Sequence, residues 1–262
     1  MKTKEKLFLK RITNRKEPIV CLTAYSKNIA IIVDEFADII LVGDSLGPVI
    51  YGYDSTRDVS LDMMINHGKA VVRNSKKAIV IVDMPFGSYE HSKYDALKNA
   101  KLILKETGAF GVKVEGGNEI SETIKYLVKN QVNVMGHIGM LPQKIKNGLF
   151  RVYGESEKEK KKIKNDAESI VSSGIFAVVI EATKETLVRE IIKDISIPTI
   201  GIGASSECSG QVLVTEDILG MTNFNAKFIK KYSDLNKVIK SSIKKFACDV
   251  KSKKYPQKKH LY

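Results

Sequence analysis

Short apolar runs rich in valine and isoleucine recur along the chain, and most of them are separated by polar segments with helical periodicity. Eight runs have the length and the β-branched content of buried strands. These predicted strands span residues 19–24, 39–43, 78–84, 111–116, 133–139, 176–182, 198–204 and 211–214. Because their apolar residues are nearly continuous, we expect strands that are covered on both faces, as in a parallel sheet.

The segments between the strands predict helices. Ser60 is a good N-cap for one, and Gly108 suits the end of another. The predicted helices cover residues 60–77, 93–107, 121–129, 155–173 and 183–195. Eight strands in alternation with helices over about 220 residues favour a closed (β/α)₈ barrel over an open doubly wound sheet. Residues 1–262 then form one domain, with a lysine-rich helical tail at about 224–262 packed outside the barrel.

Acidic residues close four of the predicted strands. They are Asp44, Asp83, Glu115 and Glu181. In a (β/α)₈ barrel, the carboxyl ends of the strands meet at one face, where the chemistry is done. A single acidic residue at such a place is often only an N-cap or a loop anchor. Four equivalent ones favour a shared polar site, because a buried carboxylate is costly without a cation or a partner.

The types of these residues indicate a hard cation. Carboxylate oxygens suit Mg²⁺, and we expect Asp44, Asp83 and Glu115 to surround one such ion. Lys113 lies two residues before Glu115, so its side chain points the same way along the strand. It would bind an anion such as the carboxylate of a 2-oxo acid, although half of a structural ion pair is an equal alternative. A metal ion and a lysine together suit the activation of a 2-oxo acid.

Glu181 stands apart from the other three carboxylates, on the sixth predicted strand. A carboxylate near a metal ion that does not ligate it can act as a general base. His137 ends the fifth strand and is a candidate hydrogen-bond partner in the same site, although a lone histidine is more often structural. These residues predict a metal-assisted barrel enzyme, and they leave its reaction open.

Composition limits the class of protein. The net charge is +13, but the lysines are dispersed and carry no nucleic-acid recognition motif, so we expect a solvated basic surface and no nucleic-acid partner. No apolar run approaches the length of a membrane helix, and residues 1–18 lack a signal-peptide pattern. Three widely spaced cysteines predict neither a disulfide framework nor a zinc site. A cytoplasmic protein without a membrane partner is expected.

Several motifs of the sequence resemble motifs of the ketopantoate hydroxymethyltransferase family. The resembling stretches follow one another in order over nearly the whole chain. They are CLTAYS at 21–26, LVGDSLGPVIYGYDST at 41–56, VDMPFGSY at 82–89, GAFGVKVEGG at 108–117, MGHIGMLPQ at 135–143, FAVVIEA at 176–182, PTIGIGA at 198–204, GQVLVTEDILG at 210–220 and the tail KKYPQKKHLY. The combination of GDSLG, DMPFGSY and GHIGMLPQ is specific.

The resemblance implies a (β/α)₈ barrel and a defined reaction. A one-carbon unit would pass from 5,10-methylenetetrahydrofolate to 3-methyl-2-oxobutanoate through a Mg²⁺-stabilised enolate, giving 2-dehydropantoate for pantothenate synthesis. By motif position, Asp44, Asp83 and Glu115 match the carboxylates at the metal. Ser45 and Lys113, with Asp44 and Asp83, match the oxo-acid contacts, and Glu181 matches the general base. Family members assemble, commonly as decamers, so a homo-oligomer is expected.

The chain departs from the family pattern at three places. Tyr153 and Glu155 stand where members often have Gln and Arg, and Ser209 stands where they often have Asp. All three residues lie in predicted loops. We therefore expect the departures to affect the closure of these loops or their contacts with folate, and not the residues that carry the chemistry. Two other functions stay open: a Mg²⁺-dependent lyase or mutase that resembles the isocitrate lyase and phosphoenolpyruvate mutase group, and a basic, non-catalytic nucleic-acid binder.

Overall fold

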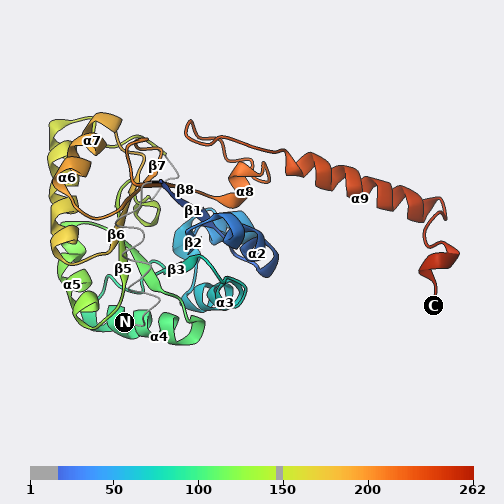
Figure 1. Ribbon diagram of the computed structural model, residues 1–262, viewed down its shortest axis with the longest axis horizontal. Coiled ribbons are helices and arrows are strands. Elements are labelled where there is room, and N and C mark those ends of the chain that lie inside the picture. Colours follow the sequence, from blue (N-terminus) through green and yellow to red (C-terminus); the bar gives the residue numbers. More distant parts are fainter. Residues whose placement is uncertain (1–16, 146–149) are drawn as a thin grey trace. The chain divides into compact units, whose positions relative to one another are not determined.

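A computed structural model describes residues 17–145 and 150–262 (Figure 1). Its centre is a closed barrel of eight parallel strands, in which each strand pairs with the next and β8 returns to β1. This confirms the predicted (β/α)₈ fold. The strands are β1 Ile19–Thr23, β2 Ile39–Val42, β3 Ile79–Asp83, β4 Gly111–Glu115, β5 Val134–Gly139, β6 Ala177–Glu181, β7 Thr199–Ile202 and β8 Gly210–Leu213.

Helices follow most of the strands and surround the barrel (Figure 1). They are α2 Lys27–Phe36, α3 Leu61–Val72, α4 Lys93–Thr107, α5 Ser121–Lys129, α6 Glu157–Ser172 and α7 Glu185–Asp194. Ser60 caps α3 by accepting a hydrogen bond from Met63 N, and Gly108 ends α4 with a φ of 74°. The predicted helices are therefore present, with ends shifted by a few residues, and α2 is an addition to them.

The alternation of side chains along each strand divides the apolar core into two layers. Ile39 and Leu41 of β2 point into the barrel and belong to an inner cluster, whereas Ile40 and Val42 pack outward against the helices. The inner cluster fills the barrel with apolar side chains: Ile19, Cys21, Ile39, Leu41, Ile81, Met135, Ala177, Val179, Ile200 and Val212. The barrel is thus a solid core, and a site must lie at one of its ends.

The inward positions change from apolar to charged at the carboxyl ends of the strands. On β3 the apolar Ile81 is followed, two residues later, by Asp83. In the β3–β4 ladder Asp83 pairs with Lys113, and in the β4–β5 ladder Glu115 pairs with His137. The parallel register therefore collects charged side chains at one end of the barrel.

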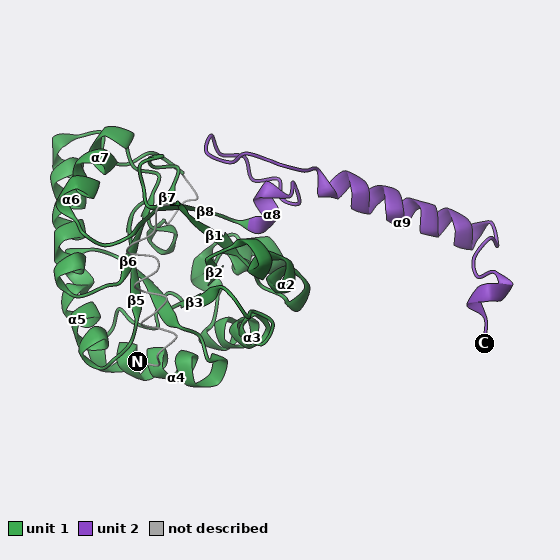
Figure 2. Ribbon diagram, in the orientation of Figure 1, with its two compact units in different colours: residues 1–214 green, residues 215–262 purple. Residues whose placement is uncertain are grey.

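The chain divides into two compact units, residues 1–214 and 215–262 (Figure 2). The second unit contains the short helix α8 Thr215–Ile218 and the lysine-rich helix α9 Leu235–Lys251. A helix was predicted in this tail, and α9 confirms it; its packing outside the barrel stays a prediction. Among the described residues, no helix is both long and apolar enough to cross a membrane.

Candidate active site

The four predicted carboxylates come together around one cavity at the carboxyl end of the barrel. Asp83, Glu115 and Glu181 are the last residues of β3, β4 and β6, and Asp44 follows β2. All four are at most 9% exposed. The cavity has a volume of about 110 Å³, and Ser45, Lys113 and His137 also line it. The structure therefore brings together every site residue that the sequence predicts.

Lys113 lies at the centre of this group. Its Nζ is 3.1 Å from Asp83 Oδ2 and 3.9 Å from Glu115 Oε1, and the side chain is almost fully buried. Burial opposes the charge of this amine, but Asp83, Glu115 and Asp44 outweigh burial and raise the pKa of Lys113 above its usual value. The lysine is therefore a permanent cation within the site. It is a member of a structural ion pair and also faces the cavity, so both sequence interpretations fit it.

His137 links two of the carboxylates. Its Nδ1 lies 3.5 Å from Glu115 Oε1, and its Nε2 lies 3.1 Å from Glu181 Oε2. Burial and Lys113 oppose protonation of the ring, but Glu115 and Glu181 prevail and raise the pKa of His137 to about 9. The ring therefore lies between these two carboxylates, and its Nδ1 is also 3.3 Å from Lys113 Nζ.

Two buried polar residues that sequence reasoning missed join the strand ends. Gln143 donates from Nε2 to Asp44 Oδ2 (2.7 Å) and to Met84 O (3.0 Å), and its backbone N–H donates to Glu115 Oε2 (3.0 Å). Tyr89 Oη donates to Gln143 Oε1 (2.7 Å) and lies 3.1 Å from Glu115 N. Both residues end stretches of the family motifs quoted above, and that was the only signal in the sequence.

The charges of the site are unbalanced. Four carboxylates face two cations, Lys113 and the imidazolium, which leaves a net charge of −2 when all are ionised. Burial, together with the charges of Asp83 and Glu115, raises the pKa of Asp44 well above its usual range. Burial also raises the pKa of Asp83, although Lys113 opposes this. Raised acidic pKa values are typical of carboxylates that are buried close to one another.

The residues present fit a divalent cation. Within the described chain, Asp83 Oδ1 and Glu115 Oε1 are buried and have no hydrogen-bond partner. Two buried carboxylate oxygens without a hydrogen bond, of which Glu115 Oε1 has only the longer ion-pair contacts given above, and an excess of negative charge suit Mg²⁺. No three acidic, histidine or cysteine side chains of the described residues are yet close enough together to form a complete metal site. Asp44 is a third carboxylate that lines the same cavity.

Ser45 lies at the rim of the cavity, where its Oγ is 2.7 Å from Tyr25 Oη. Tyr25 follows β1, so this hydrogen bond joins the ends of two neighbouring strands. The serine hydroxyl is held in place by the tyrosine and can still offer a hydrogen bond to a small anion in the cavity.

The three departures from the family pattern have different surroundings. Ser209 lies at the amino end of β8, where its Oγ accepts from Thr199 N (3.2 Å); this is the end of the barrel opposite the site. The expectation that Ser209 bears on loop closure or folate contact was therefore wrong, because its side chain fixes the start of two strands. Tyr153 and Glu155 do lie at the carboxyl end of the barrel, where Glu155 pairs with Lys184 at 2.9 Å.

Comparisons with known proteins give the site its context. A family model described as ketopantoate hydroxymethyltransferase matches residues 4–258. The chain belongs to the ketopantoate hydroxymethyltransferase family. A relative from Rhizobium etli, named 3-methyl-2-oxobutanoate hydroxymethyltransferase, is 53% identical over 248 residues, which cover 94% of this chain and 91% of the relative. A relative of the same name from Rhodospirillum rubrum is 46% identical and covers 98% and 95%.

Solved structures of low sequence identity share the fold of this ketopantoate hydroxymethyltransferase family member. A phosphoenolpyruvate phosphomutase from Streptomyces platensis superposes with a TM-score of 0.64 at 11% identity, covering 94% of this chain and 87% of that one. A phosphonopyruvate hydrolase in complex with oxalate and Mg²⁺ gives 0.63 at 10% identity, with coverages of 95% and 87%. At this identity the likeness concerns the barrel fold alone.

Proposed function

We propose that this protein transfers a hydroxymethyl group from 5,10-methylenetetrahydrofolate to 3-methyl-2-oxobutanoate, forming 2-dehydropantoate for pantothenate synthesis. The observation that carries the proposal is the buried cavity in which Asp44, Asp83, Glu115, Lys113 and Glu181 meet. Family membership supplies the reaction, and the cavity has the cationic and basic groups which that reaction needs. The volume of about 110 Å³ suits a small oxo acid.

Asp44, Asp83 and Glu115 are the residues that would hold Mg²⁺. When bound there, the ion would withdraw electrons from the keto oxygen of the oxo acid and make the proton on the neighbouring carbon more acidic. Lys113 would bind the substrate carboxylate, because its ammonium lines the cavity and is the cation closest to Asp83 and Glu115 there. Ser45 offers a further hydrogen bond to the same group. The oxo acid is thereby oriented with its C3 atom toward β6.

Glu181 is the general base. Its carboxylate lines the cavity and stays 9% exposed, so it can reach a substrate carbon and still exchange its proton with water. His137 is a positioning residue, since its Nε2 lies 3.1 Å from Glu181 Oε2. After Glu181 removes the C3 proton, the nucleophilic carbon attacks the methylene carbon of the folate. Both carbon–nitrogen bonds of the methylene bridge break, water supplies the hydroxyl group, and the two folate nitrogens take up the remaining protons.

The exchange of the C3 proton in D₂O tests this assignment directly. We expect the wild-type protein with Mg²⁺ to exchange the C3 proton of 3-methyl-2-oxobutanoate, followed by NMR, before any folate is added. EDTA should abolish the exchange. The variant Glu181→Gln should lose it, and the matched control Glu185→Gln, at the exposed start of α7, should keep it. Exchange that persists in Glu181→Gln would refute the role of the base.

The product assay separates this reaction from that of a lyase or mutase of related fold. Formation of 2-dehydropantoate after methylenetetrahydrofolate is added would establish the transfer. Exchange without that product would mean a 2-oxo-acid site with another second substrate. Absence of both exchange and product would contradict the proposed reaction and favour the alternative of a nucleic-acid binder. That alternative predicts salt-sensitive binding to DNA or RNA.

We also propose that the protein is a homo-oligomer, a decamer by family resemblance. Helix α9 supports self-association, because Ile239, Ile243, Phe246 and Val250 recur at helical spacing and are 37–62% exposed. In sedimentation experiments, Phe246→Lys should lower the molecular mass of the assembly, whereas Lys244→Ala on another face should not. An unchanged mass for Phe246→Lys would exclude this face as an interface.

A further inference from the structure

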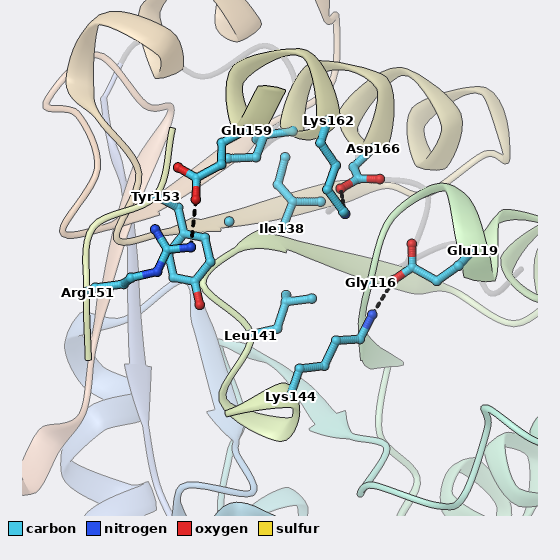
Figure 3. A pocket seen from close by; sticks show the side chains of 12 residues that line it. Gly116, Glu119, Ile138, Leu141, Lys144, Arg151, Tyr153, Glu159, Lys162 and Asp166 are labelled. Carbon is cyan, nitrogen blue, oxygen red and sulfur yellow. Dashed lines mark hydrogen bonds and ion pairs between the residues drawn. The ribbon is translucent and has the colours of Figure 1, made fainter. Parts of the chain in front are cut away.

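A second, larger cavity lies beside the first, at the carboxyl ends of β4 and β5 and against α6 (Figure 3). Its volume is about 520 Å³, which is in the range of sites that hold a whole organic ligand. Ile138 and Leu141 form an apolar floor. The catalytic cavity of about 110 Å³ cannot hold both an oxo acid and a folate, so the proposed reaction needs a second space next to it.

The wall between the two cavities is the backbone of the strand ends. Gly116, which lines the larger cavity, directly follows Glu115 and donates from its backbone N–H to His137 O at 3.0 Å. Gly139 lines it too and pairs with Glu181 in the β5–β6 ladder. A Cβ at Gly139 would lie 2.3 Å from Glu181 O, so the close approach requires glycine at this point. A ligand in the larger cavity is therefore one strand away from the proposed base.

Another side of the cavity is formed by residues that are hydrogen-bonded to the end of β6. Tyr153 donates from its backbone N–H to Ala182 O at 2.8 Å, and Ala182 directly follows Glu181. The guanidinium of Arg151 lies over the Tyr153 ring at 4.0 Å from its centroid. The stacked side chains of Arg151 and Tyr153 thus form one side of the cavity (Figure 3).

The rim of the cavity carries three ion pairs, which Figure 3 marks with dashed lines. They are Arg151–Glu159 (2.6 Å), Lys162–Asp166 (2.5 Å) and Lys144–Glu119. Because each cation already has a carboxylate, the rim has no net charge and does not favour a polyanion such as a polyphosphate. It offers carboxylate acceptors and cationic donors around an apolar floor. That combination suits a flat heterocycle whose edge carries both N–H donors and carbonyl acceptors.

We propose that this cavity binds the pteridine ring of the one-carbon donor, an inference that rests on the proposed function. The ring lies on Ile138 and Leu141 beside the surface formed by Arg151 and Tyr153. The amino-pyrimidine edge of the ring donates to carboxylates of the rim, and its carbonyl accepts from the cations. Bound in this way, the ring presents its methylene carbon toward the end of β6, where Glu181 activates the oxo acid.

Two variants and one matched control test the site, with tetrahydrofolate as the probe. Arg151→Met removes the flat cation, and Glu119→Gln removes one carboxylate of the rim. Glu122→Gln, on the exposed surface of α5, is the control. Loss of a charged hydrogen bond predicts about a tenfold weaker affinity for tetrahydrofolate in each of the first two variants, measured by equilibrium dialysis. The control should stay within about twofold of wild type, since it removes no ligand contact.

The exchange of the C3 proton in D₂O distinguishes this inference from the proposed function, because it needs no folate. We expect exchange with Mg²⁺ to continue in Arg151→Met and Glu119→Gln while tetrahydrofolate binding falls. Unchanged tetrahydrofolate affinity in both variants would overturn the inference and leave the proposed function standing. Loss of exchange together with folate binding in both variants would also overturn it, because the cavity would then only support the catalytic fold. A wild-type protein that binds no tetrahydrofolate would contradict the proposed function itself.

Discussion

Gln143→Leu should be among the most destabilising polar substitutions in the barrel. The side chain is 2% exposed and makes three hydrogen bonds, from Nε2 to Asp44 Oδ2, from Nε2 to Met84 O and from Tyr89 Oη to its Oε1. Leucine has a similar size but makes none of them. The substitution therefore leaves a buried carboxylate, a buried carbonyl and a buried hydroxyl with fewer partners.

The magnitude follows from the type of each bond. The hydrogen bond to the Asp44 carboxyl contributes about 1–3 kcal/mol, with the upper value for the ionised form, and each of the two neutral bonds contributes about 0.5–1.5 kcal/mol. The apolar leucine side chain regains about 1 kcal/mol through burial. We expect the free energy of unfolding to fall by about 3 kcal/mol, which moves the urea midpoint down by about 1 M or more.

The assay is urea unfolding in EDTA, followed by circular dichroism, so that bound metal ions do not contribute. Gln211→Leu is the matched control, because Gln211 is exposed and its Nε2 makes one hydrogen bond, to Ser205 O at 2.8 Å. The control should lose about 1 kcal/mol or less. If Gln143→Leu were no less stable than Gln211→Leu, the bonds that join the strand ends would not hold the site together, and this reasoning would be wrong.

Three further predictions concern other parts of the molecule. Asp34→Ala should lower the free energy of unfolding by about 3 kcal/mol in urea titrations, because the buried carboxylate accepts from three successive backbone N–H groups at 76–78; a loss below about 1 kcal/mol would contradict this. Native protein should react with a thiol reagent at Cys248 alone, since burial raises the pKa of the Cys21 and Cys208 thiols; labelling of Cys21 before unfolding would refute the buried core. Mg²⁺ at about a hundred times its dissociation constant should add about 2.7 kcal/mol of stability and raise the melting temperature by several degrees, and an equal rise with K⁺ would mean a general salt effect.

The sequence determined the elements of the barrel because their signals are local. Runs of Val and Ile specify the strands, and Ser60 and Gly108 mark helix ends through capping, which needs only neighbouring residues. The period-two alternation of a strand placed Lys113 and Glu115 on the same face. Since parallel strands bring their carboxyl ends together, the convergence of the predicted carboxylates followed from the fold class alone.

Tertiary structure decided the contacts between residues that are distant in the chain. Gln143 reaches Asp44 across 99 positions, and no periodicity or spacing encodes that hydrogen bond. His137 became a partner of Glu115 and Glu181 only through the register of three strands. Ser209 was predicted to lie in a loop, but its Oγ accepts a hydrogen bond from Thr199 N at the start of β7, a contact that also depends on how the strands are paired. Such contacts depend on how the closed barrel sets the loops against one another, so the site's charge balance and its second cavity could be read only from the folded chain.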